Sequence, residues 1–117
     1  MIPSDALDNL NSCTCLQGDF SYENFVESVI GSDKNFADVS ILRCKKCNRQ
    51  WLRYYYVQEA FTKSGRWFHG IVEPSIAQAL KADDAMAILE NLEWYYAGGS
   101  YFEGKVRKTR GKLDLST

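Results

Sequence analysis

The sequence DVSILRCKKCNRQWLRYYYVQEAF, at residues 38–61, places a pair of cysteines between two extended segments. Residues 38–44 alternate loosely and include β-branched side chains, which predicts a strand that ends at the first cysteine of CKKC. From Trp51 onward the side chains alternate again, with aromatic residues on both faces, so we expect a central strand. The turn TKSG and the segment RWFHGIV (66–72) complete a three-stranded antiparallel meander.

Segments on either side of this meander have helical periodicity. In SYENFVESVI (21–30), apolar residues fall at i, i+3, i+4, i+7 and i+8, between a serine and a glycine that suit the two helix ends. Residues 83–96 carry a second apolar stripe, and a short helix or turn is expected over 75–80. The expected fold class is α+β: a three-stranded antiparallel meander packed by two main helices, with a four-cysteine structural zinc site.

The 117 residues favour a single zinc-stabilised domain over 1–117, because the chain has no repeat, no low-complexity tract and no flexible linker. No apolar run is long enough for a transmembrane helix, and MIPSDALDNLNS at the start lacks the features of a secretory signal. We therefore expect a cytoplasmic protein with no membrane partner. Residues 105–117 are rich in bases and poor in apolar side chains, so a flexible basic tail is expected.

The four cysteines occur in two close pairs, Cys13 with Cys15 and Cys44 with Cys47. Four thiolates are the ligand set of a closed, structural zinc site, and an extended Cys-x-Cys can aim both sulfurs the same way. Such a site would anchor the N-terminal segment to the sheet. The alternatives are a redox-active CxxC, two disulfides, or four ordinary buried thiols. A catalytic zinc is disfavoured, because four thiolates leave no open coordination position.

The second pair has the clearer local signal. CKKCNRQW (44–51) lies between two strand patterns and resembles the zinc knuckles of zinc-ribbon proteins over residues 42–51. In those knuckles a glycine commonly follows the second cysteine; here the position is Asn48, the residue type that tolerates positive φ next best. The resemblance implies a hairpin turn that presents two thiolates to zinc. Neighbouring bases would offset the negative charge of a four-thiolate site.

No catalytic constellation is evident, because the chain lacks P-loop, GxGxxG, HExxH and GxSxG patterns. The single histidine, His69, is expected to pack in a strand and to use one nitrogen in a hydrogen bond. We therefore expect a non-enzymatic protein. Its aromatic residues exceed what one small core needs, and exposed Tyr, Trp and Arg are typical anchors of protein interfaces. The candidate partner-binding residues are Trp51, Arg53, Tyr55, Trp67, Trp94 and Tyr95.

The charge pattern favours a protein partner. Acids are in excess over 1–40 and 73–104 and bases over 41–72 and 105–117, while the net charge is −1. We expect a protein-interaction module, such as a small bacterial immunity or accessory protein whose acidic surfaces meet a basic toxin nuclease. The first alternative is a zinc-ribbon-like nucleic-acid-binding protein, and the second is a thiol redox protein that uses Cys44 or Cys47. The nucleic-acid alternative would use Arg43, Lys45, Lys46, Arg49, Lys105, Arg107, Lys108 and Arg110.

Overall fold

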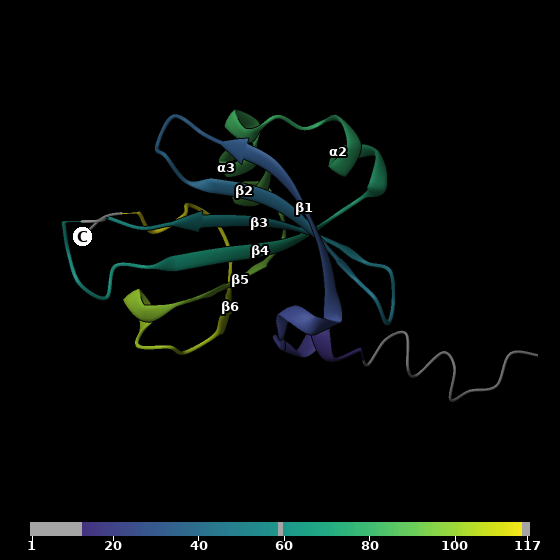
Figure 1. Ribbon diagram of the computed structural model, residues 1–117, viewed down its shortest axis with the longest axis horizontal. Coiled ribbons are helices and arrows are strands. Elements are labelled where there is room, and N and C mark those ends of the chain that lie inside the picture. Colours follow the sequence, from purple (N-terminus) through teal and green to yellow (C-terminus); the bar gives the residue numbers. More distant parts are fainter. Residues whose placement is uncertain (1–12, 59, 116–117) are drawn as a thin grey trace, which may run out of the picture.

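A computed structural model describes residues 13–58 and 60–115 and has one antiparallel sheet whose six strands follow the order of the chain (Figure 1). The strands are β1 (Phe25–Ser32), β2 (Asp38–Cys44), β3 (Gln50–Tyr56), β4 (Arg66–Val72), β5 (Tyr95–Gly98) and β6 (Arg107–Thr109). The helical elements are η1 (Thr14–Gln17), η2 (Tyr22–Asn24), α2 (Pro74–Ala79), η3 (Ala82–Asp84), α3 (Ala85–Glu90) and η4 (Ser100–Phe102).

The expected fold class is wrong. The sheet has six strands and not three, and the only α-helices in the described residues, α2 and α3, have six residues each. Both fall far short of the ~20 residues that a bilayer-spanning helix needs. The meander of β2, β3 and β4 lies where the alternation placed it, but it is the middle of a larger sheet.

The helix expected over 21–30 is wrong, because most of this segment is strand β1. β1 pairs with β2 from Phe25 opposite Cys44 to Ser32 opposite Asp38. Its apolar spacing does not mark a buried face, since Val29 is 79% exposed. The hydrogen bonds that β2 offers along the whole segment outweigh a weak helical periodicity among β-branched residues.

The helix expected over 83–96 is also wrong in extent. Only α3, Ala85–Glu90, is α-helical, and β5 begins at Tyr95. Ala85 and Leu89 are buried against the sheet, and this packing stabilises α3. The aromatic residues that follow suit an extended strand, and Tyr96 pairs with His69 of β4.

The segment for which we expected a flexible tail contains a strand. β6 pairs with β5, and Tyr96 lies opposite Lys108. Beyond it, Leu113 is buried, and the Arg66 guanidinium donates a hydrogen bond to the carbonyl oxygen of Asp114 at 3.1 Å. These contacts hold residues 107–115 against the body of the protein.

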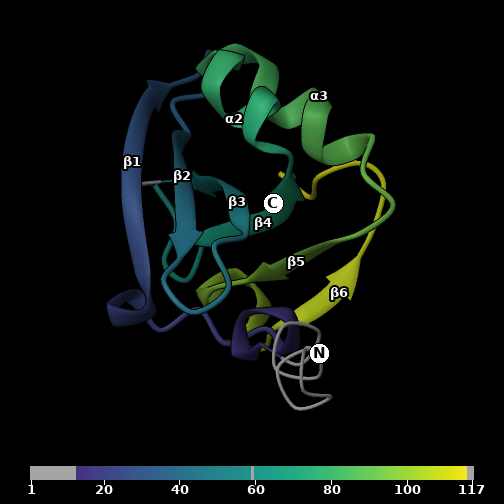
Figure 2. The ribbon, with the colours of Figure 1, turned by 90° about the vertical axis from the view of Figure 1, so that its right-hand side faces the viewer.

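The two faces of the sheet bury two separate cores. Side chains of β3 alternate between them: Leu52 and Tyr54 pack toward α3, whereas Trp51 packs toward the N-terminal turns. Figure 2 shows the helices on one side of the curved sheet and the N-terminal turns, in purple, on the other. We call these the helix-side core and the cysteine-side core. The cysteine-side core contains Cys13, Cys15, Phe25, Leu42, Cys44, Trp51 and Tyr96.

Candidate metal centre

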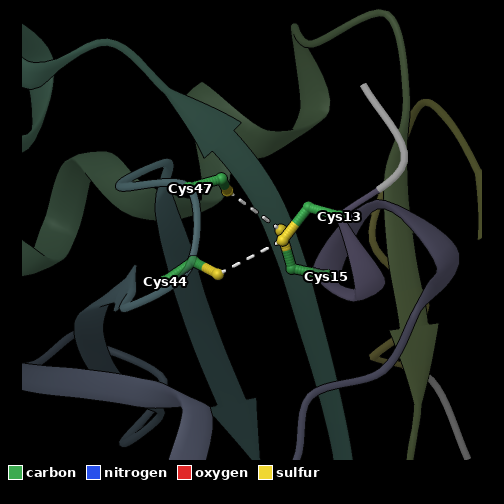
Figure 3. A group of neighbouring side chains, drawn as sticks. All are labelled: Cys13, Cys15, Cys44 and Cys47. Atoms are coloured by element: carbon green, nitrogen blue, oxygen red, sulfur yellow. Dashed lines mark hydrogen bonds between the residues drawn. The ribbon is translucent and has the colours of Figure 1, made fainter. Parts of the chain in front are cut away.

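Two separate turns bring the four cysteines together at one end of the cysteine-side core. Cys13 and Cys15 lie at the start of η1, Cys44 ends β2, and Cys47 lies in the turn before β3. Figure 3 shows the four side chains pointing toward one another. All four Sγ atoms lie within 4.8 Å of one another, so the cluster could hold a metal ion. The prediction that the two pairs converge is confirmed.

The sulfur separations match a four-coordinate metal site. The Sγ atoms of Cys13 and Cys44 are 3.6 Å apart, as are those of Cys15 and Cys47. A tetrahedron with zinc–sulfur bonds of about 2.3 Å has edges of about 3.8 Å, whereas a disulfide bond is about 2.05 Å long. All four cysteines are free thiols. The geometry therefore fits a tetrahedral ligand set and contains no disulfide.

The CKKC turn has the backbone that the sequence predicted. Asn48 adopts a φ of +64°, in the left-handed region. Its N–H donates to the carbonyl oxygen of Cys44 at 2.8 Å, and the N–H of Cys44 donates to the carbonyl oxygen of Arg49 at 2.9 Å. These bonds close a tight hairpin between β2 and β3, which fixes the two cysteines on one side of the turn.

The first cysteine pair differs from the expected extended Cys-x-Cys. Cys15 is within the 3-10 turn η1, and the N–H of Leu16 donates to the carbonyl oxygen of Cys13 at 2.9 Å. Gly18 ends the turn with a φ of +86°. The turn tightens the chain so that both sulfurs still reach the cluster, because Cys13 itself precedes the helical residues with an extended backbone.

The surroundings affect the ionisation of the thiols in different directions. Burial raises the pKa of Cys15. Burial also raises the pKa of Cys44, although the backbone N–H groups of Cys47 and Lys46 partly offset this by favouring its thiolate. Burial opposes ionisation of Cys47 too, but hydrogen bonds from the backbone and side chain of Arg49, together with those from Cys15 and Cys13, outweigh it and lower the pKa of Cys47 to about 7. A metal ion would need to displace the protons of the buried thiols, as thiolate ligation always does.

Trp51 supplies a donor that suits a thiolate. Its buried Nε1 has no hydrogen-bond partner of ordinary geometry among the described residues. The same indole N–H nevertheless lowers the pKa of Cys15, so it lies near that sulfur. A buried N–H without an acceptor is costly, and an ionised Cys15 would provide one. This orphaned donor is a feature that a metal-bound thiolate would satisfy, which supports the fit of the site to a metal. We expected Trp51 to contact a partner, and nothing in the local sequence signals its place beside the sulfurs.

Two lysines of the CKKC turn contact the N-terminal segment. Lys45 Nζ donates to the carbonyl oxygen of Glu23 at 3.0 Å, and Lys46 Nζ lies 3.4 Å from Thr14 Oγ1. The N–H of Lys45 also donates to the carbonyl oxygen of Asn24 at 2.8 Å. Part of the basic block is therefore occupied in joining the two halves of the cysteine cluster.

The six candidate partner-binding residues do not form one surface. Trp51 and Tyr95 are buried on opposite faces of the sheet, so we do not retain them as contact residues. Arg53, Tyr55 and Trp67 are half-buried and adjacent, since Tyr55 pairs with Trp67 across β3 and β4. Trp94, also half-buried, packs on Trp51 with ring centroids 6.0 Å apart.

The basic residues of the nucleic-acid alternative lie in two groups. One group surrounds the CKKC turn and the other lies on and beside β6, and all are exposed except the half-buried Arg49. Lys108 Nζ lies over the Trp94 ring at 4.2 Å from its centroid. Arg107 lies over the Phe102 ring, at 5.0 Å from its centroid. Phosphate contacts on β6 would thus have aromatic rings beside them.

Comparison with protein-family models, with curated proteins and with solved structures finds no match to this chain. The resemblance to zinc knuckles is confined to the CKKC turn, and the wider fold does not extend it. The chemistry of the site therefore rests on the geometry of these four cysteines and of the groups around them.

Proposed function

We propose that the chain binds one zinc ion through Cys13, Cys15, Cys44 and Cys47, and that this ion is structural. The observation that carries the proposal is the convergence of four sulfurs within 4.8 Å, from segments about thirty residues apart in the chain. Thiolates in tetrahedral array favour zinc among the common divalent ions. Bound there, zinc would supply a cross-link, and four thiolates leave no position for water or substrate.

The cross-link would hold η1 in place over the cysteine-side core. η1 covers this core, and the Tyr96 hydroxyl donates a hydrogen bond to the carbonyl oxygen of Leu16. η1 has only four residues, so the ion would replace the packing that a longer helix provides. This is the common logic of small domains whose core alone is marginal.

The test of the metal site is elemental analysis of protein purified without added metal. One zinc per chain is expected, and none is expected in the Cys44→Ser and Cys47→Ser variants. Thr14→Ser, a change beside the site that removes no sulfur, is the control. Slow alkylation of all four thiols in the zinc-loaded protein separates a structural site from the thiol redox alternative. Zinc-free protein with unchanged thermal stability would contradict the proposal.

We propose further that the protein is a non-enzymatic interaction module, of the kind that small bacterial immunity and accessory proteins represent. The supporting observation is a set of exposed apolar side chains on and beside edge strand β1: Tyr22 is 87%, Val29 79% and Phe36 90% exposed. Exposed carboxylates stand among them, at Glu23, Glu27 and Asp38. Exposed apolar side chains with carboxylates around them suit a partner whose surface is basic.

The interaction test compares two sets of surface variants in a pull-down from the native cell. Val29→Thr and Phe36→Ser should abolish capture of a basic partner, whereas Phe61→Ser, 58% exposed on the β3–β4 connection, should leave it intact. Capture should weaken as salt rises. Equal capture by all three variants would contradict this surface.

The nucleic-acid alternative rests on Lys108 beside Trp94 and on the exposed bases of the knuckle. It predicts oligonucleotide binding that falls steeply with salt, by a slope that reports the phosphates neutralised. Absence of oligonucleotide binding at low salt would eliminate it.

A further inference from the structure

The cysteine-side face carries a pocket separate from the cysteine cluster. It has a volume of about 560 Å³ and lies between the loop 18–22 and strands β1 to β4. Small-molecule sites are commonly of this size. None of the four cysteines lines it; its walls include Phe20 and Trp67, and its polar groups include Arg53 and His69.

His69 is a buried polar side chain that lacks a partner. It is 3% exposed, and neither ring nitrogen makes a hydrogen bond within the described residues. Trp67 stacks on its ring at 4.2 Å between centroids, and Phe20 meets it edge-on at 4.3 Å. The ring thus lines the pocket between two aromatic side chains, and both of its buried nitrogens are left without a hydrogen-bond partner in the described part of the chain. Burial, with a smaller effect from Arg53, lowers the pKa of His69 well below its usual value, so the ring is neutral and offers one donor and one acceptor.

Arg53 lies beside His69, and its guanidinium N–H groups can donate hydrogen bonds to a ligand. The two residues are directly paired across β3 and β4. The carboxylate that the guanidinium faces, Glu27 Oε2, is 3.8 Å from Nη1, too far for a hydrogen bond. Glu27 Oε2 instead accepts a hydrogen bond from Ser40 Oγ at 2.7 Å. The guanidinium is otherwise placed over the Tyr55 ring, at 4.9 Å from its centroid.

We propose that this pocket binds a small, uncharged, planar ring compound with an amide edge, the class that includes pyrimidine bases. The carbonyl oxygen of the edge would accept from Arg53, and its adjacent N–H would donate to the unprotonated nitrogen of His69. The aromatic walls suit a flat ring. Anions are disfavoured, because Glu27 and Asp19 also line the pocket and outnumber its one guanidinium.

The wall of the pocket is continuous with the cysteine turn. The N–H of Gly18 donates to the carbonyl oxygen of Cys15 at 3.2 Å, and that of Asp19 donates to Thr14 at 3.1 Å. Arg53 and His69 themselves belong to the sheet and do not need the metal to meet. The ligand site thus goes beyond the proposed zinc site and is tested separately from it.

The test is a titration of the ¹⁵N-labelled full chain followed by NMR. Uracil should shift the His69 ring nitrogens and the backbone amides of Arg53 and Trp67, with a dissociation constant of roughly millimolar or below, as its small size allows. 1,3-Dimethyluracil keeps the ring and carbonyls but lacks both N–H groups, so it should bind at least ~10-fold more weakly. Benzoate, a flat anion, should not bind.

Variants locate the site. Arg53→Met should abolish the uracil shifts, whereas Arg110→Met, the same change at an exposed arginine, should not alter them. His69→Phe should also abolish uracil binding. If that variant does not fold, His69→Gln serves in its place; it keeps a donor and an acceptor and should retain part of the binding. The proposal is overturned if uracil causes no shift, if dimethyluracil binds equally well, or if Arg53→Met leaves binding unchanged.

Discussion

Single residues around the four cysteines give their thiols different tendencies to ionise. Asn48 turns the chain with positive φ, and Arg49 favours the thiolate of Cys47, whose pKa is about 7. Cys15, in contrast, is held in its protonated form by burial. A cluster with one easily ionised sulfur can accept a cation in steps, since the first bond formed lowers the pKa of the remaining thiols.

His69 makes stability depend on pH. Its folded-state pKa lies well below the usual value of about 6.5, because of burial and the nearby Arg53. Unfolded chains therefore bind a proton that the folded protein does not, and stability present above pH ~6.5 is lost as pH falls below it. Denaturant midpoints measured from pH 8 to pH 5 should show this decline.

The His69→Gln variant isolates this contribution, because acid also protonates the cysteine ligands in both proteins. Its midpoint should fall less steeply than that of the unmodified protein between pH ~6.5 and 5. Parallel curves for the two proteins would contradict the assignment.

At the scale of elements, the corner between β5 and η4 requires a glycine. Gly99 has a φ of +113°, and a Cβ there would lie 2.6 Å from the carbonyl oxygen of Gly65 and 2.9 Å from Arg66 Cα. Both neighbours are backbone, so they cannot yield easily. Gly99→Ala should lower the free energy of unfolding by about 1–3 kcal/mol or more, as measured by urea denaturation.

Gly104→Ala is the matched control for this corner. Gly104 also has positive φ, +77°, but a Cβ there meets nothing within 4 Å. Gly104→Ala should lower the free energy of unfolding by only about 1–2 kcal/mol, the penalty for placing a residue with a Cβ in the left-handed region. If Gly99→Ala lowered the free energy of unfolding less than Gly104→Ala, the close backbone contact at Gly99 would not explain why a glycine is required there.

The C-terminal segment contributes to stability through one buried side chain. Leu113 packs into the helix-side core and is 5% exposed. Leu113→Ala should lower the free energy of unfolding by about 2–5 kcal/mol, because it removes buried methyl groups and leaves a cavity. The neighbouring Lys112→Ala, at an exposed position, should change it by less than about 0.5 kcal/mol. Equal effects of the two substitutions in urea denaturation would mean that residues 107–115 do not pack stably against the body of the protein.

In the whole molecule, the sheet separates a core that helices cover from a core that depends on the cysteines. Removing the ion should therefore affect the two faces unequally. Structural zinc supplies roughly 10–16 kcal/mol in zinc-finger peptides at pH 7, as much as a typical domain's entire stability. Chelator-treated protein should melt at a much lower temperature than the zinc-loaded protein.

Hydrogen exchange locates this loss. Protection should disappear first in η1 and in the β2–β3 turn, and last in β3 and β4 beneath α3, where Leu52, Phe68 and Leu89 are buried together. Uniform loss on both faces would mean that the cores unfold as one unit. Unchanged melting after verified zinc removal would contradict the structural role of the metal.

Features that depend on near neighbours in the chain were predictable from the order of the amino acids. Alternation over 38–44 and 66–72 was sufficient to predict β2 and β4, because side chains of a strand point to opposite faces in turn. The count and pairing of cysteines predicted the cluster, and Asn48 predicted the left-handed turn. Each of these follows from geometry within a few residues or from the ligand number of a metal.

Features that depend on distant partners could be found only in the folded chain. The segment 25–32 is a strand because β2 supplies its hydrogen bonds, and β5 and β6 exist because β4 continues the sheet toward them. Register across β3 and β4 placed Arg53 beside His69, and two layers of packing buried Trp51 and Tyr95. Local periodicity cannot decide such outcomes, because the free energy of a short element comes mostly from the surface that it pairs with or covers.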